Sequence, residues 1–197
     1  MSKTSAFVGN GLYIIESSIS VATITFWVIG YGLMYGAKTA GFISLGSDVF
    51  FNPGLGAHDV FFQTVFAATA ATIVSGAIAG RAKYSTYILF TVVMTAIIYP
   101  ISGGWQWQGS GWLTELGFID FAGSSIVHGV GGFVGTVLVA FFGSPSLGGK
   151  VEGIEMGKQL GTQLFAAIAV AIFTIVVTFV ILKTLQATIG LKVEEQD

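Results

Sequence analysis

The feature that most constrains this chain is a series of five long stretches without a charged side chain. A helix needs about 20 apolar residues to cross the roughly 30 Å hydrocarbon core of a bilayer. The runs are continuously apolar rather than alternating, which favours helices over barrel strands. The sequence therefore predicts an all-α integral membrane protein. The stretches are residues 17–37, 60–80, 84–114, 121–149 and 159–182.

Turn residues set the ends of the predicted helices. The third helix is expected to end near Pro100, because proline has no backbone N–H and disrupts a regular helix. The five helices form a single transmembrane domain over residues 1–197, which closes with a short polar tail at 191–197. The predicted transmembrane helices span residues 11–36, 59–80, 84–101, 119–143 and 159–188.

Composition excludes several classes of function. Only 9% of the residues are charged and 53% are hydrophobic, whereas soluble domains carry about 25% charged residues. The net charge of −2 leaves no basic surface for nucleic acid. The chain has no cysteine, so thiolate metal sites and thiol nucleophiles are ruled out. No enzyme motif or metal-ligand spacing is visible, so we expect neither an enzyme nor a cofactor. Residues 1–10 contain no cleavage signal, and no removable leader is expected.

The distribution of lysine and arginine gives a weak orientation. With the N-terminus inside, five basic residues lie in the cytoplasm and three lie outside, which modestly favours that topology. The five are Lys3, Arg81, Lys83, Lys150 and Lys158, and the three are Lys38, Lys183 and Lys192.

Three ionisable residues fall at membrane depth, where such groups are costly and tend to face the bundle interior. They are Glu16, Asp120 and His128. Asp120 is expected to cap the fourth helix. His128 lies eight residues further on, roughly 12 Å along a helix, and is predicted to be buried near the middle of the bilayer. A neutral imidazole offers one donor and one acceptor, which suits ammonia or water. The alternative is a structural histidine satisfied by neighbouring helices.

Aromatic pairs give weaker signals. Phe62 and Phe66 are four residues apart and share a helix face, so their rings could form a dry constriction or simply fill space. Trp105 and Trp107 could offer a π face to a cation or act as interfacial anchors.

Longer motifs resemble the Amt/Mep/Rh ammonium transporters. The similar segments are residues 62–77, 99–100, 104–107 and 120–128, the last reading D-F-A-G-x-x-x-x-H. The resemblance implies a carrier of ammonium or ammonia rather than an enzyme. It implies that Phe66 is the inner phenylalanine of a pore gate with Phe62 one turn away, and that Trp107 belongs to an external recruitment site. Asp120 would be the structural aspartate below that site, and His128 the first of two pore-lining histidines.

The same resemblance implies that the chain is a partial member. Residues up to His128 resemble helices two to five of an eleven-helix fold, whereas those after it resemble helices ten and eleven, as if the chain were truncated or internally deleted. A homotrimer in the lipid bilayer of the plasma (inner) membrane is expected by resemblance. Two alternatives stay open: a non-transporting fragment or interaction partner of full-length relatives, and a channel for another small solute.

Overall fold

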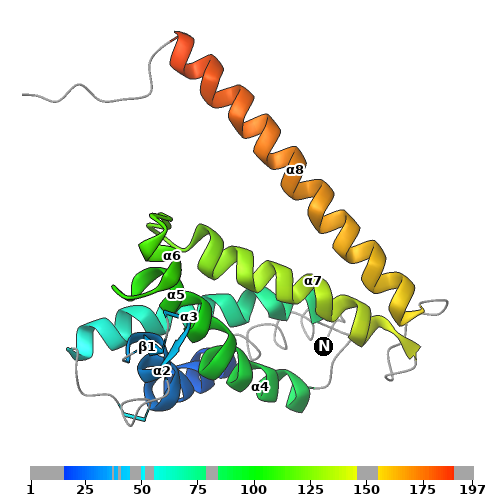
Figure 1. Ribbon diagram of the computed structural model, residues 1–197. Helices are drawn as coiled ribbons and strands as arrows, with labels where there is room; N and C mark the ends of the chain where they lie inside the picture. Colours follow the sequence, from blue (N-terminus) through cyan, green and yellow to red (C-terminus); the bar gives the residue numbers. More distant parts are fainter. Residues whose placement is uncertain are drawn as a thin grey trace, which may run out of the picture.

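A computed structural model describes residues 16–36, 38–39, 41–44, 50–51, 56–78, 84–145 and 155–188. In these residues the regular secondary structure is helical apart from one two-stranded hairpin (Figure 1). The prediction of an all-α chain with five long apolar helices is confirmed. The helices long and apolar enough to cross a membrane are Glu16–Tyr35, Ala57–Ala77, Tyr84–Glu115, Ser124–Gly143 and Met156–Ile181.

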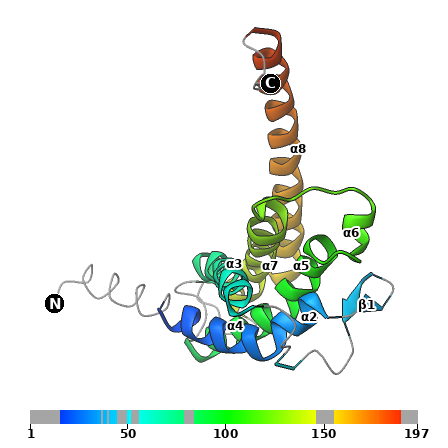
Figure 2. The same ribbon diagram turned by 90° about the vertical axis from the view of Figure 1, so that its left-hand side faces the viewer.

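The first span runs from residue 16 through a π-helical turn, η1 (Phe26–Gly30), into α2 (Tyr31–Tyr35). A short antiparallel hairpin of β1 (Lys38–Thr39) and β2 (Ile43–Ser44) follows. The hairpin lies on the same side of the molecule as α5 and α6 (Figure 2). There the indole N–H of Trp105 donates to the carbonyl of Phe42 at 2.9 Å, which fastens the hairpin to the third span.

The third span does not end at Pro100, and that prediction is wrong. α4 (Tyr84–Val93) passes through a second π-helical turn, η3 (Met94–Ile98), into α5 (Tyr99–Trp107), and α6 (Trp112–Glu115) follows. Pro100 lies in the first turn after η3, where a missing N–H costs little. Gly30 permits the close contact between η1 and η3, since a Cβ there would lie 2.3 Å from the Thr95 carbonyl oxygen.

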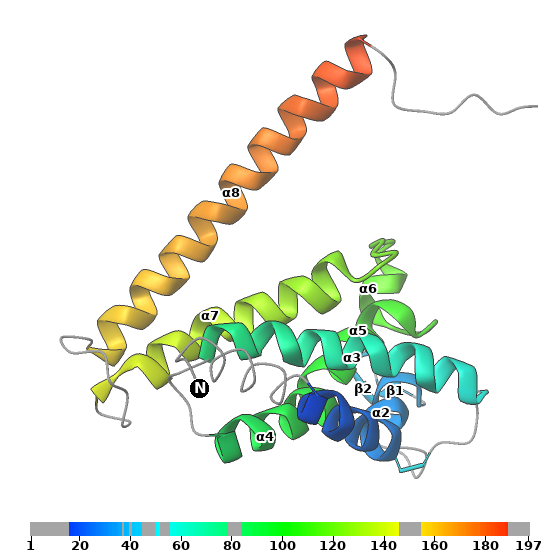
Figure 3. The ribbon, with the colours of Figure 1, turned by 180° about the vertical axis from the view of Figure 1, so that it is seen from behind.

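The centre of the bundle is formed by α3 (Ala57–Ile78) and α7 (Val130–Gly143), which run side by side (Figures 1 and 3). Close approach of the two helices depends on Gly131 and Gly135, because a Cβ at these positions would lie 2.8 Å from Ala70 O and 3.1 Å from Ala77 Cβ. Such small residues let helix backbones meet in lipid. The main buried cluster comprises Phe26, Tyr31, Met34, Ala67, Ala70, Ala71, Met94, Tyr99, Ile126 and Val127.

The last helix, α8 (Met156–Thr188), begins beside α7 and then leaves the bundle (Figures 1 and 3). None of its most apolar stretch is buried. The predicted start at residue 159 was three residues late. The expected ends at 11 for the first helix and 80 for the second lie outside the described residues.

Candidate functional site

Asp120 organises the turn that precedes the fourth span. Its Oδ1 accepts hydrogen bonds from the backbone N–H groups of Gly123 and Ser124, both at 2.8 Å. Its Oδ2 accepts from those of Ser125 and Ile126, both at 2.9 Å. The first N–H groups of a helix have no partner within the helix, so the buried carboxylate satisfies them. Asp120 thus caps the π-helical turn η4 (Ser124–Gly129), which leads into α7.

This arrangement also sets the charge state of Asp120. Burial raises the pKa of a carboxyl group, but four backbone N–H donors favour the ionised form. The donors outweigh burial, and the pKa of Asp120 lies below its ordinary value. A negative charge at the start of a helix is further favoured by the helix dipole. The site therefore contains a carboxylate that is ionised at neutral pH and whose oxygens already accept hydrogen bonds from the backbone.

Gly123 makes this cap possible. Its φ of 83° lies in the left-handed region, which glycine adopts without strain. A Cβ at this position would come within 2.4 Å of Val127 Cγ2 and 3.4 Å of the Trp107 ring. Because of this turn, the helix begins at Ser124. The predicted start at residue 119 was therefore too early.

A row of aromatic rings leads from the exposed surface to this cap. The rings of Phe62 and Phe66 meet edge to face with centroids 5.0 Å apart, and Phe66 and Trp107 follow at 6.1 Å. The indole N–H of Trp107 donates to the Asp120 carbonyl at 2.8 Å. Phe62 is 60% exposed, whereas Phe66 and Trp107 are half-buried and pack against the core. The structure thus joins four of the five predicted site residues through direct contacts.

His128 is exposed in the chain, which corrects the expectation that it is buried. The helix begins at Ser124, so only about one turn precedes His128, and it lies nearer one end of its span than the middle. Its Nδ1 lies 3.2 Å from the carbonyl oxygen of Gly123. A carbonyl can only accept, so in the neutral ring Nδ1 carries the proton and Nε2 keeps its lone pair. The imidazole therefore offers a hydrogen-bond acceptor on an open face.

Two neighbours of the aromatic row were missed by sequence reasoning. Tyr99 lies with its ring centroid 6.5 Å from that of Trp107. Its hydroxyl donates to Gln63 Oε1 at 3.2 Å. Both residues fall inside the motifs that suggested the family, but neither has a spacing that marks it as part of a site. Trp105 differs from Trp107, because its indole bonds to the hairpin rather than to the cap.

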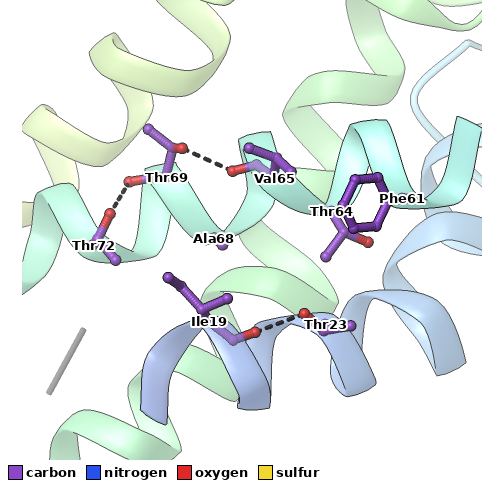
Figure 4. Close-up of a pocket in the computed structure, with 8 residues that line it drawn as sticks. All are labelled: Ile19, Thr23, Phe61, Thr64, Val65, Ala68, Thr69 and Thr72. Atoms are coloured by element: carbon purple, nitrogen blue, oxygen red, sulfur yellow. Dashed lines mark hydrogen bonds between the residues drawn. The ribbon is translucent and has the colours of Figure 1, made fainter. Parts of the chain in front are cut away.

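A separate groove of about 290 Å³ runs between residues 16–25 and α3 (Figure 4). Each threonine in its wall donates its hydroxyl to a carbonyl of its own helix, as Thr23 does to Ile19 and Thr69 to Val65. These hydroxyl protons are therefore not free to donate to a polar solute. Its remaining lining residues are Phe61, Thr64, Ala68 and Thr72.

The fold and the site define an all-helical membrane protein in which Trp107, Asp120 and His128 lie around the start of one helix. The chain matches the Ammonium Transporter Family over residues 5–149 and again over 126–197. It belongs to this family, and it is accordingly an integral, multi-pass membrane protein. The family consists of transporters and channels rather than enzymes, as the sequence predicted.

Individual relatives agree with this assignment. Over 145 residues the chain is 42% identical to the ammonium transporter Amt2 of Archaeoglobus fulgidus, covering 66% of this chain and 30% of that protein. Among solved structures, it is similar to a sensor Amt protein with a TM-score of 0.60 and 34% identity, covering 75% of this chain and 41% of the other. A Mep2 variant from Candida albicans, S453D, gives a TM-score of 0.55 at 28% identity, covering 61% and 29%.

The chain spans about 30% of the length of the curated relatives it matches. Its two matched segments overlap in residues 126–149. The helix of His128 therefore lies largely within both matched segments.

Proposed function

We propose that this protein takes part in the passage of ammonium or ammonia across a membrane. Ammonium would be recruited at Trp107, whose ring can attract a cation, and would transfer a proton to water there. Neutral ammonia would then pass Phe66 and Phe62 and reach His128, whose free Nε2 accepts a hydrogen bond from an N–H donor. Asp120 would hold Trp107 and the start of the His128 helix in place without touching the solute.

The observation that carries this proposal is the continuous contact from Phe62 through Phe66 and Trp107 to Asp120. Two phenyl rings in edge-to-face contact exclude water and oppose the passage of a hydrated ion. The carboxylate of Asp120 is fully engaged by backbone N–H groups. It therefore supplies no strong binding site that would retain a cation along the way.

The exposure of residues in the proposed pathway favours a second function. Phe62 and His128 are exposed in the chain, and the relatives contain further chain that could cover them. The protein would then be a non-transporting partner of longer relatives, which buries this face against them. This alternative predicts no flux from the purified chain alone.

The test is uptake of ammonium or methylammonium into proteoliposomes by the wild type and by His128→Ala. A hydrogen bond of about 1.4 kcal/mol lost at the rate-limiting step corresponds to about a tenfold fall in flux. His58→Ala is the matched control, because His58 is exposed and, among the described residues, pairs with Asp59 at 3.3 Å. Equal flux in wild type, His128→Ala and His58→Ala would remove His128 from the pathway, and no flux in any of them would favour the partner function.

A further inference from the structure

A hydrogen bond between two side chains joins the helices that carry Phe66 and Trp107. The hydroxyl of Tyr99, at the start of α5, donates to Gln63 Oε1 of α3 at 3.2 Å. Gln63 lies three residues before Phe66 and therefore on the same face of α3. Tyr99 and Trp107 both belong to α5, and their ring centroids are 6.5 Å apart. The two helices are thus connected twice, once by this bond and once by the contact of the Phe66 and Trp107 rings.

The surroundings of Tyr99 leave its hydroxyl little freedom to move. The side chain is fully buried. Its ring contacts the rings of both Phe26 and Trp107, with centroids 5.9 and 6.5 Å away. The bilayer core contains no water that could compete for a buried donor, and hydrogen bonds between helices stabilise their association there. The bond to Gln63 therefore fixes where the Tyr99 ring lies relative to α3.

Gln63 has a second hydrogen-bond partner. Its side chain is also bonded to Tyr35, the last residue of α2. An amide offers one oxygen acceptor and two N–H donors, so one glutamine can bond to two hydroxyl groups at the same time. Gln63 consequently links α3 to both α2 and α5.

We propose that Gln63 is a positioning residue for ammonium binding, which holds the Trp107 ring against Phe66 through its bond to Tyr99. This inference rests on the transport function proposed above, in which Trp107 recruits the cation. Backbone packing alone does not set the distance between these rings, because α3 runs beside α7 and meets α5 only over a short stretch. Gln63 acts through Tyr99 and need not touch the solute.

Loss of this bond should weaken ammonium binding more than it slows maximal uptake. A ring attracts a cation only within about 6 Å of its centroid, so a Trp107 ring that is free to turn offers a poorer site. From the average strength of hydrogen bonds between membrane helices, Tyr99→Phe and Gln63→Leu should each raise the half-saturating ammonium concentration about threefold. The double variant should resemble either single variant, because the bond can be lost only once.

Tyr87→Phe is the matched control. Tyr87 is buried in α4, and its hydroxyl has no hydrogen-bond partner in the part of the chain that the structure describes. The control therefore removes the same oxygen from a buried tyrosine without breaking a bond. Circular dichroism and elution in detergent verify that each variant is folded, and uptake into proteoliposomes gives the half-saturating concentration.

The position of the Trp107 ring is measured apart from transport, by acrylamide quenching of tryptophan fluorescence. The chain has four tryptophans, so the signal of Trp107 is the difference between each protein and the same protein carrying Trp107→Phe. Quenching of Trp107 should increase in Tyr99→Phe and Gln63→Leu, because the ring loses its support, and should stay unchanged in Tyr87→Phe.

The two measurements separate this proposal from the transport function. Increased quenching together with a raised half-saturating concentration, in both variants but not in Tyr87→Phe, supports the positioning role. If either quantity is unchanged, or if Tyr87→Phe gives equal effects, the proposal is overturned while the transport function stands. Effects that add in the double variant also overturn it, because the two side chains would then act independently. Absence of wild-type flux overturns the transport function and, with it, the role of Gln63 in ammonium binding.

Discussion

The indole nitrogen of Trp107 lies 2.8 Å from the main-chain carbonyl oxygen of Asp120 and donates a hydrogen bond to it. This bond joins the end of α5 to the turn before η4, across the short helix α6. The same aspartate caps η4 through its side chain. One residue therefore fixes both the proposed recruiting ring and the helix that carries His128.

Replacing Trp107 by phenylalanine should lower ammonium flux without unfolding the protein. The variant loses one hydrogen bond, worth about 1 kcal/mol, and the ring becomes free to turn against Phe66. Trp105→Phe loses a bond of similar length to Phe42 and serves as the matched control. We expect Trp107→Phe to reduce uptake by about fivefold and Trp105→Phe to leave it within about twofold. Similar losses in both variants would assign Trp107 to general packing.

Pro100 is the residue at which the structure departs most clearly from the helix ends expected from the sequence. A proline between apolar residues predicts the end of a helix, yet the span continues to Trp107. The π-helical turn at residues 94–98 changes the hydrogen-bond register just before the proline, and no local residue pattern marks such a turn. The length of an apolar stretch, by contrast, does not depend on the hydrogen-bond register of the helix. The five spans could therefore be predicted from the lengths of the uncharged stretches along the chain.

The candidate site, like the fold, could be predicted only in part from the sequence. Asp120 was recognised as a cap, because a carboxylate before an apolar run has few other roles. The exposure of His128 could not be predicted, since burial depends on which helices cover a face. The sequence places the histidine in a membrane span, but it does not say that α8 leaves the bundle and that this face stays open.

Removal of the Asp120 side chain should destabilise the fold. Asp120→Ala leaves four backbone N–H groups without their acceptor, and we expect a loss of about 2 kcal/mol in the free energy of unfolding, at the upper end for helix caps. Glu115→Ala is the control, because this carboxylate is exposed and its loss should change stability by less than about 0.5 kcal/mol. Unfolding in mixed detergent micelles, followed by circular dichroism, measures both. Equal stability of the two variants would contradict the capping role.

Acidification should weaken the same cap. The pKa of Asp120 is lower in the folded chain than its ordinary value, so the folded state prefers the ionised form. Its contribution is fully present above the pKa of an unfolded aspartate, about 3.9, and is lost as the pH falls through the lower folded value. The wild type should therefore lose more stability below pH of about 4 than Asp120→Asn, which cannot ionise. Parallel pH profiles for the two proteins would show that another group is responsible.

A last prediction separates backbone strain from steric contact in the turn before η4. Gly117 and Gly123 both have positive φ, 77° and 83°. A Cβ at Gly117 would meet no atom within 4 Å, whereas a Cβ at Gly123 would strike Val127 and approach Trp107. Gly117→Ala should cost only the strain of a left-handed alanine, about 1 kcal/mol. Gly123→Ala should cost that amount and about 1–3 kcal/mol more for overpacking.

The two variants should differ in flux as well as in stability. Because the alanine methyl at position 123 lies against Val127 and the Trp107 ring, it should displace both the proposed recruiting residue and the helix of His128. Gly117→Ala leaves these residues in place and should transport at nearly the wild-type rate. Unfolding in mixed micelles and uptake into proteoliposomes measure the two effects separately. If both alanines lowered stability equally and left uptake unchanged, Gly123 would serve the turn alone and its contacts would carry no function.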